Sequence, residues 1–217
     1  MTVLVAVIVA LVAVTATVLI MAPRGREAVE ASPEVSSSSA PATTDPSAAS
    51  PSPSVSQVTA DGCLGGAVEL NRAIVSAQEQ APLTAEGAAA FTATLLRWTS
   101  ASPAPAYKAD TATQVLAQDA TTLVQDWVAS QAPANVTTAA DLSSGRFYIE
   151  SYSPTRAVVS YIAAATGTQD GVELVPATIS GAVTLVAQNG TWHLQNLTSE
   201  RDVSDLQAVS SPYTGGC

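Results

Sequence analysis

The sequence predicts an α+β protein in which an N-terminal transmembrane helix precedes one domain, with two or three helices packed on a curved, four-stranded antiparallel sheet. Three observations lead to this prediction. Residues 3–21 form one uncharged apolar run, apolar residues then recur at helical spacing as far as Pro133, and beyond Pro133 they alternate as in β-strands. Because helical and strand segments are separate along the chain, the helices are expected to cover one face of the sheet.

The apolar run predicts an uncleaved transmembrane signal-anchor over residues 1–22. Its only polar side chains are Thr15 and Thr17, and as an α-helix it would span about 30 Å, the thickness of a bilayer core. The alternative is a cleavable signal peptide. The apolar region of a signal peptide is typically about 7–15 residues long and follows basic residues, and neither condition holds here.

The orientation of the anchor depends on two opposing signals. Arg24 and Arg26 follow the apolar run, and the positive-inside rule would place them in the cytoplasm together with the domain. The composition of the next segment and the two cysteines favour the opposite orientation, which a basic tail upstream of Met1 would explain. We expect a single-pass protein of the cell membrane with its C-terminal domain outside the cytoplasm.

Residues 23–60 are predicted to be a disordered linker. Residues 27–60 contain ten Ser and five Pro but no aromatic residue, Leu or Ile, so they cannot form a packed core. A flexible chain of this length would hold the domain about 30–40 Å from the membrane. We interpret the segment as a spacer.

The two cysteines, Cys63 and Cys217, lie at the two ends of the predicted domain, residues 61–217. A disulfide between them would close one long loop, worth about 4–5 kcal/mol from loop-closure entropy, and would persist in an oxidising compartment. Two free thiols or an intermolecular bridge through Cys217 are the alternatives. Metal binding is not expected, since the cysteines lack ligand spacing and His193 is the only histidine. We predict a structural disulfide.

The domain is acidic, with fourteen Asp and Glu residues against six Lys and Arg over residues 61–217. Such a surface repels phosphates, and no basic patch is visible in the sequence. We therefore expect no direct nucleic-acid binding. The chain also lacks a P-loop, a G-x-G-x-x-G fingerprint and a G-x-S-x-G motif, so no cofactor and no enzymatic activity are predicted.

Helical periodicity is strongest after Thr84, a favourable N-cap with Glu86 in the first turn. This helix carries an apolar stripe and ends at the Ser-Pro-Ala-Pro run 102–105; the stripe is Ala88, Phe91, Leu95 and Trp98. A second helix is expected from Asp110 or Thr111, with the stripe Leu116, Ala120, Leu123 and Trp127. Residues 68–78 predict a third, weaker helix or a strap across the core.

Four strands are predicted after Pro133, at residues 146–152, 156–168, 177–188 and 191–197. The turns between them contain Ser-Pro-Thr, Asp-Gly and Asn-Gly, and the last two are strong hairpin signals. In the last strand Trp192 and Leu194 point into the core, so His193 is expected to point away from it. A short helix is predicted over residues 203–208.

A helical half followed by long hairpin strands, the last with the pattern Gly190-x-Trp192-x-Leu194, resembles the cone-shaped fold of nuclear transport factor 2. Membrane-anchored relatives of that fold share this layout. They include VirB-type assembly factors of type IV secretion, TcpC-type conjugation proteins and actinobacterial Mce-associated membrane proteins. Four stretches further resemble small anchored proteins encoded beside conjugation genes in actinobacteria: APLTAEGAAAF–LLRW, GRFYIESY, ATGTQDG and SPYTGGC.

The resemblance implies a scaffold or assembly component of a cell-envelope machine, above all of conjugative type IV secretion, or else an accessory protein of Mce-associated lipid transport. Its expected partners are the membrane, other envelope or secretion-system proteins and, by analogy, further copies of itself. No catalytic residue carries over from these families.

A small-molecule pocket on the concave sheet is the alternative hypothesis. It would need polar groups converging between apolar walls, and the candidates are Tyr148, Glu150, Tyr152, Tyr161 and His193. The first three equally suit a half-exposed sheet face, where Arg146 and Glu150 would form a surface pair. Trp98 and Trp127 are core residues by default, with a partner interface as the alternative.

Overall fold

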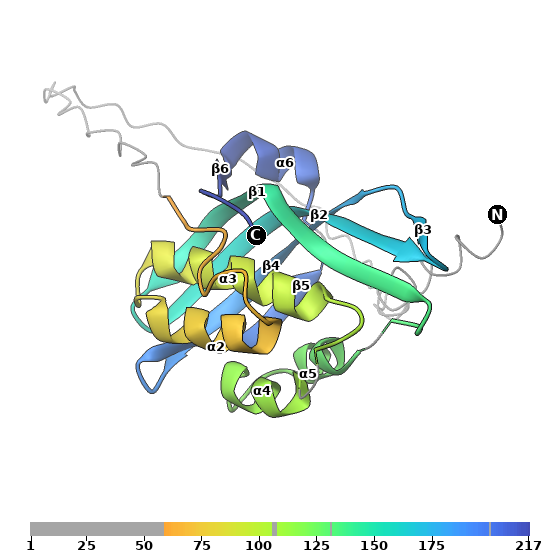
Figure 1. The fold of residues 1–217 in the computed structure, drawn as a ribbon. Coiled ribbons are helices and arrows are strands. Elements are labelled where there is room, and N and C mark those ends of the chain that lie inside the picture. The colour runs from red at the N-terminus through yellow and green to blue at the C-terminus, as the bar shows by residue number, and fades with distance from the viewer. Residues whose placement is uncertain (1–58, 106–107, 131, 200) are drawn as a thin grey trace, which may run out of the picture. The chain divides into compact units, whose positions relative to one another are not determined.

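The computed structural model describes residues 59–105, 108–130, 132–199 and 201–217 (Figure 1). The predicted signal-anchor, residues 1–22, and nearly all of the predicted linker lie outside the described residues. None of the helices in the described part of the chain combines the length and apolar character needed to cross a bilayer. The anchor and the linker therefore stay predictions.

Two helices, α2 (Leu70–Gln80) and α3 (Ala85–Ser100), lie on one face of the sheet (Figure 1). Helix α3 begins as predicted, because the Thr84 hydroxyl accepts a hydrogen bond from the Gly87 amide at 3.1 Å. Every residue from Gly87 to Thr99 is buried. The many alanines of this helix allow close packing on all sides, so α3 is the central helix of the core.

The predicted second helix is instead two helices, α4 (Lys108–Val115) and α5 (Thr122–Ala129). Residues 116–121 between them lie along the edge strand of the sheet: the Ala117 amide donates to the Leu194 carbonyl at 2.9 Å, and the Thr121 amide to the Gln195 carbonyl at 3.0 Å. The predicted stripe is therefore not one helix face, and Leu123 is 48% exposed. The apolar residues that these two helices bury are instead Val115, Val124 and Val128.

The antiparallel meander is confirmed, but the sheet has six strands among the described residues rather than four. The order is β5-β4-β2-β1-β6, and β3 pairs with β2. Two of the strands are pairs of residues that the sequence pattern is too short to reveal, and β1 begins ten residues before the predicted start. The bounds are β1 (Val136–Ser153), β2 (Arg156–Gln169), β3 (Val172–Glu173), β4 (Ala177–Gln188), β5 (Thr191–Ser199) and β6 (Ser211–Pro212).

Two predicted hairpin turns have the backbone conformation that their residues favour. Asp170 and Asn189 have φ of 53° and 52°, and the glycines that follow, Gly171 and Gly190, have φ of 79° and 83°. Positive φ at both central residues is the requirement of the tight hairpin turn, and it explains why Asp-Gly and Asn-Gly occupy these two positions.

The first third of β1 and the end of β2 form an extension that we call the arm: residues 136–141 and 164–169, with residues 170–176 at its tip (Figure 1). The outer edge of the arm is partly paired. Ser102 exchanges two backbone hydrogen bonds with Thr138, at 2.9 and 3.1 Å, and the Ser100 hydroxyl accepts from the Ala140 amide. This segment after α3 holds the arm against the helical layer.

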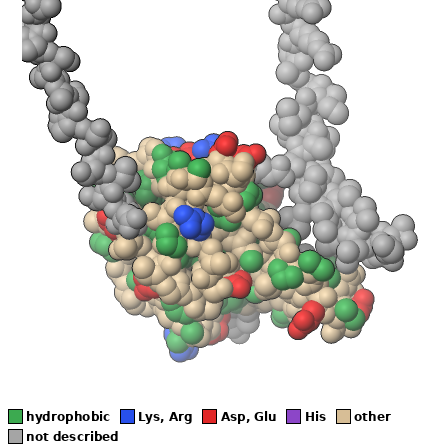
Figure 2. All heavy atoms as spheres, turned by 90° about the horizontal axis from the view of Figure 1, so that it is seen from above, with side chains coloured by type: hydrophobic (Ala, Val, Ile, Leu, Met, Phe, Trp, Pro, Cys, Tyr) green, Lys and Arg blue, Asp and Glu red, His purple; other side chains and the backbone are tan. Residues whose placement is uncertain are grey.

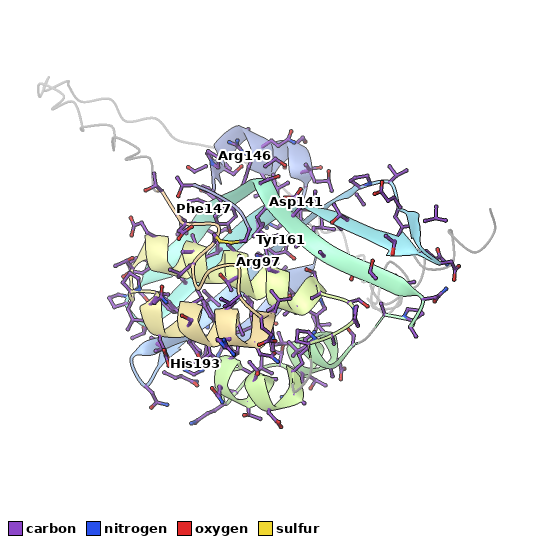
Figure 3. All side chains as sticks on the ribbon, viewed as in Figure 1. Arg97, Asp141, Arg146, Phe147, Tyr161 and His193 are labelled. Atoms are coloured by element: carbon purple, nitrogen blue, oxygen red, sulfur yellow. A yellow bond between two sulfur atoms is a disulfide. The ribbon has the colours of Figure 1, made fainter. Side chains whose placement is uncertain are left out.

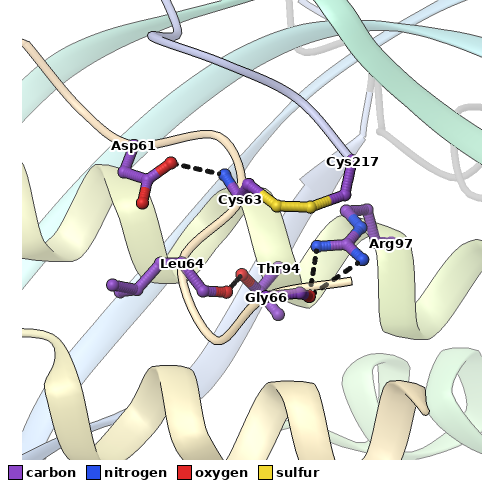
Figure 4. Close-up of a disulfide and its surroundings, with 7 residues drawn as sticks. All are labelled: Asp61, Cys63, Leu64, Gly66, Thr94, Arg97 and Cys217. Atoms are coloured by element: carbon purple, nitrogen blue, oxygen red, sulfur yellow. Dashed lines mark hydrogen bonds between the residues drawn. A yellow bond between two sulfur atoms is a disulfide. The ribbon is translucent and has the colours of Figure 1, made fainter. Parts of the chain in front are cut away.

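The two ends of the domain are joined. The structure places Cys63 and Cys217 at disulfide distance, with 5.3 Å between their Cα atoms, as predicted (Figure 4). Backbone hydrogen bonds reinforce the junction, since the Gly62 amide donates to the Thr214 carbonyl and the Thr214 amide to the Ala60 carbonyl. The loop between them is held on α3, where the Thr94 hydroxyl donates to the Leu64 carbonyl at 2.6 Å.

The hydroxyl of Tyr213 is buried and has no hydrogen-bond partner among the described residues. Its ring packs on Phe147, with 4.9 Å between ring centroids, in the core that also contains Tyr161. Burial raises the pKa of Tyr161 to about 12 and, together with the neighbouring Tyr161, raises the pKa of Tyr213 as well. Both phenols are therefore neutral in the folded protein.

We expect Tyr213→Phe to stabilise the protein by about 1–3 kcal/mol at neutral pH, because it removes a buried hydroxyl without a partner. The advantage should grow above pH about 10, where the unfolded tyrosine ionises but the folded one stays protonated, so wild-type stability falls as the pH rises through that range. Urea unfolding of both proteins at neutral and alkaline pH measures this. A less stable variant at neutral pH would instead mean that the hydroxyl has a partner, such as a buried water.

Candidate functional site

A surface cleft lies between β1 and helix α6 (Val203–Val209), and Tyr148 is the one predicted pocket residue in its lining. The cleft has a volume of about 420 Å³. Helix α6 covers the face of the sheet opposite to α2 and α3, which the prediction of helices on a single face did not include (Figure 1). The lining residues are Tyr148, Arg201, Asp202, Asp205, Leu206 and Val209.

Helix α6 has a well-defined start that fixes the acidic side of the cleft. One carboxylate oxygen of Asp202 accepts hydrogen bonds from the Ser204 amide at 2.8 Å and the Asp205 amide at 3.2 Å. The Ser204 hydroxyl also donates to this oxygen. Its hydrogen bond is the largest of the effects that hold the pKa of Asp202 below its usual value, and the two amide hydrogen bonds add to it. Leu206, one turn on, is buried, whereas Val209 is 55% exposed.

Glu150 belongs to a polar network that reaches the cleft through Arg201, one of the lining residues. Its carboxylate pairs with Arg201 and accepts a hydrogen bond from the buried Ser160 hydroxyl. The Ser180 hydroxyl donates to the Arg201 carbonyl at 2.7 Å and so ties the segment before α6 to β4. The predicted surface pair of Arg146 with Glu150 is replaced by this arrangement.

Arg146 does not pair with Glu150 but binds the C-terminal end of α6. Its Nε donates to the Ser210 hydroxyl at 2.9 Å, and a second guanidinium nitrogen donates to the Ser210 carbonyl, at the end of α6. A cation at the C-terminal end of a helix is favoured by the helix dipole. Arg146 and Arg201 therefore fasten the two ends of α6 to the sheet.

A β-bulge separates Tyr152 from Tyr148. The pairing of β1 with β2 shifts register between Ile149 and Ser151, so Glu150 is the extra residue and Tyr152 lies opposite the buried Ala157. Tyr152 is consequently on the side of the helices, where its hydroxyl donates to the Leu83 carbonyl at 2.6 Å.

The other two predicted pocket residues lie elsewhere (Figure 3). Tyr161 is a buried core residue beside Phe147. His193, on the edge strand β5, points away from the core that Trp192 and Leu194 enter, as predicted. Its Nε2 lies 3.1 Å from the Gln188 carbonyl and its Nδ1 lies 3.4 Å from Gln78 Nε2, so both ring nitrogens have neighbours within the fold.

The two tryptophans singled out as possible interface residues pack inward. Trp98 is fully buried, and its indole nitrogen donates to Asn71 Oδ1 at 2.8 Å. Lys108 lies over its ring at 5.4 Å and donates to the Thr99 carbonyl. Trp127 is partly buried and packs against the core cluster. Trp98 is therefore a core residue and not part of a surface.

Two buried cations near the C-terminal end of α3 escaped the sequence analysis. Arg97 donates two long hydrogen bonds, of 3.4 Å, to the Gly66 carbonyl below the disulfide (Figure 4). Burial lowers the pKa of both Arg97 and Lys108. Their position at the end of the helix suits positive charge, and they hold the Cys63 loop and the segment after α3 in place.

The tip of the arm presents apolar side chains to solvent. Val172 is 69% and Val175 90% exposed. The sequence signal for this tip is the Val-Glu-Leu-Val-Pro run that follows the Asp-Gly turn. In the part of the chain that the structure describes, no three His, Cys, Asp or Glu side chains are grouped to hold a metal ion. On the face drawn in Figure 2, apolar, acidic and basic side chains are interspersed, with basic and acidic ones side by side along the upper rim.

Comparisons of the chain with protein-family models, with curated proteins and with solved structures gave no significant match. The cleft and the tip of the arm are the candidate functional surfaces of the described residues.

Proposed function

We propose that this protein is a membrane-anchored scaffold or assembly component of a cell-envelope machine, with its domain outside the cytoplasm and without enzymatic activity. The proposed machine is conjugative type IV secretion. One observation carries the proposal: the apolar tip of the arm, where Val172 and Val175 are exposed. Apolar side chains gathered on a surface mark protein–protein contact sites, and these two are the most exposed large apolar side chains in the part of the chain that the structure describes.

The construction of the arm suits docking. Its two long strands are paired along residues 136–141 and 164–169, and Ser102 pairs with its outer edge. An arm held in this way presents its tip with little conformational freedom to lose on binding, which favours affinity. The apolar side chains thus project from a supported hairpin instead of a free loop.

Two sequence features support the proposed location. The apolar residues 3–21 are long enough to anchor the chain, and the linker would let the tip reach partners about 30–40 Å or more from the membrane. The paired cysteines, Cys63 and Cys217, suit an oxidising compartment outside the cytoplasm.

Photo-crosslinking on native membranes tests the proposal. A benzoylphenylalanine at position 175 is expected to crosslink an envelope or secretion subunit, whereas the same group at the exposed Gln125 of α5 is not. Mass spectrometry of the product identifies the partner. Lipid-transport subunits in the product would favour the Mce-associated alternative, and equal products from both positions would contradict docking through the tip.

The double substitution Val172→Asp and Val175→Asp is expected to abolish that crosslinked complex, as probed from a benzoylphenylalanine at Leu174. Because both side chains are exposed, the free energy of unfolding should change by less than about 0.5 kcal/mol. Co-purification from detergent-solubilised membranes and a urea unfolding curve measure the two effects. Retention of the partner by a folded double variant would rule out the tip as the docking element.

A further inference from the structure

We propose that the cleft between Tyr148 and α6 binds a basic side chain, Lys or Arg, presented by a segment of a partner protein. This site is separate from the tip of the arm, and the inference does not depend on docking there. It rests on the shape of the cleft, the exposed ring within it and the charges around it.

The ring of Tyr148 is the first element of the site. It is 39% exposed, lines the cleft, and its hydroxyl has no hydrogen bond to the described residues. An exposed aromatic face attracts a cation through its quadrupole, and Lys and Arg are the side chains that exploit this attraction. The ring is thus available to a ligand.

The charges around the cleft favour a cation over an anion. Arg201 is neutralised by Glu150, and Arg146 is held by Ser210 outside the cleft lining. Two carboxylates of the lining, those of Asp202 and Asp205, have no cationic partner among the described residues. The hydrogen bonds to the Asp202 carboxylate lower its pKa and so favour its charged form. An anionic ligand would meet both carboxylates, whereas a basic side chain would complement them.

The apolar part of the lining suits a long side chain. Leu206 and Val209 lie on the same helix as Asp205, and Val209 is 55% exposed. Lys and Arg bury their aliphatic stems on apolar surface while the charged end stays with polar groups. The cleft offers both, with Leu206 and Val209 for the stem and the ring and carboxylates for the head.

The charge of the domain as a whole supports the same occupant. Its acidic residues exceed its basic ones over residues 61–217, so a basic segment would be drawn to it and an acidic one, or a second copy of this domain, would be repelled. We therefore commit to a basic segment of a different protein.

Fluorescence anisotropy on the full chain in detergent tests the proposal. The probe is the fluorescein-labelled peptide Gly-Ser-Leu-Arg-Leu-Ser, compared with matched peptides that carry citrulline or Glu in place of Arg. The Arg peptide is expected to bind about threefold to tenfold more tightly than the citrulline peptide, and raised salt should weaken its binding. Equal binding of all three peptides, or no binding of the Arg peptide, would overturn the proposal.

Variants of the cleft locate the binding. The double variant Asp202→Asn with Asp205→Asn removes two charges, while the amide introduced at position 202 can still cap α6. This double variant should lose the preference for the Arg peptide over the citrulline peptide. Tyr148→Leu should weaken the Arg peptide about twofold to fivefold. The matched control is Glu79→Gln with Asp126→Asn, which makes the same charge change at exposed positions of α2 and α5.

The outcomes separate the possible occupants. Loss of preference in the cleft variant alone supports the proposal, while equal loss in the control would show that only overall acidity matters. Thermal unfolding checks that each variant is folded. If the double Asn variant does not fold, the Tyr148→Leu variant still tests whether the peptide binds in the cleft. Analytical ultracentrifugation of the wild type and the cleft variant would reveal a dimer that depends on the cleft, in which case the occupant is a second copy and the proposal is wrong.

Discussion

Replacing Cys63 and Cys217 together by serine is expected to lower the free energy of unfolding by about 4 kcal/mol. The two residues are 154 positions apart, so the bridge restricts nearly the whole unfolded domain, and the loss of that restriction favours the unfolded state. Small domains are stable by about 5–15 kcal/mol, so this loss would remove between about a quarter and four-fifths of that stability. Urea unfolding of the full chain in detergent, followed by circular dichroism, measures the change.

The control for this prediction is the wild-type chain in reducing agent, which should lose the same stability as the serine variant. Hydrogen exchange should show the earliest opening at residues 60–66 and 211–217, because these segments pair with each other or with β1 next to the bridge. An unchanged unfolding midpoint in both the variant and the reduced protein would mean that the cysteine pair contributes nothing to stability.

Trp192→Ala is expected to destabilise the protein by about 3–5 kcal/mol. Trp192 is fully buried on β5, and its indole nitrogen donates to the Pro82 carbonyl at 2.9 Å, in the loop between α2 and α3. The substitution leaves a large cavity between the sheet and the helices and also removes one of the two hydrogen bonds that this carbonyl accepts, the other coming from the Thr84 amide at 2.8 Å. Urea unfolding measures the loss.

Two further substitutions divide this effect into its parts. Trp192→Phe keeps most of the apolar volume and loses the hydrogen bond, so it should cost about 1–2 kcal/mol. Trp127→Ala removes the same side chain from a partly buried position on α5 and should cost less than Trp192→Ala. If both tryptophan-to-alanine variants lose equal stability, the central role assigned to Trp192 is wrong.

Features that depend on a few neighbouring residues were predictable from the sequence. The Thr84 cap, the Asp170-Gly171 and Asn189-Gly190 turns and the inward direction of Trp192 and Leu194 follow from local conformation and alternation. The cysteine pair was predictable for a different reason, since the chain offers one intramolecular combination. The cap, the turns and the alternation depend on a few adjacent residues, and the cysteine pairing depends on the number of cysteines in the chain.

Features that depend on distant backbone contacts were not predictable. The helix expected after Asp110 is interrupted because residues 116–121 satisfy the edge of β5, which lies more than seventy positions away in the sequence. The bulge at Glu150 changes the side on which Tyr152 lies, although the alternation of residue types looks regular. The early part of β1, Val-Thr-Thr-Ala-Ala-Asp, has little apolar alternation because all of it belongs to the arm, where only Val136 and Ala140 are buried.

The pocket hypothesis shows how such contacts redistribute candidate residues. Tyr148, Tyr152 and Tyr161 lie within fourteen positions of one another in the sequence, yet one lines the surface cleft, one hydrogen-bonds to the helical layer and one is buried in the core. The cleft itself depends on α6, whose position is fixed by Arg146 and by the pair of Arg201 with Glu150. Neither long-range contact has a signature in the sequence.

The bridge between Cys63 and Cys217 also determines how the domain would respond to mechanical tension. If the chain before Thr59 is pulled against a partner held at the tip of the arm, two chain segments run in parallel from the bridge to the tip: residues 63–172 and residues 175–217. The shorter one limits how far the domain can lengthen, to about 150 Å even when fully extended. Without the bridge, the longer segment alone would carry the force and would unravel to more than twice that length. The covalent link at the ends of the domain therefore limits how far the domain can extend under tension. If the chain is tethered and its tip is bound, the distance between tether and partner stays shorter than it would without the bridge.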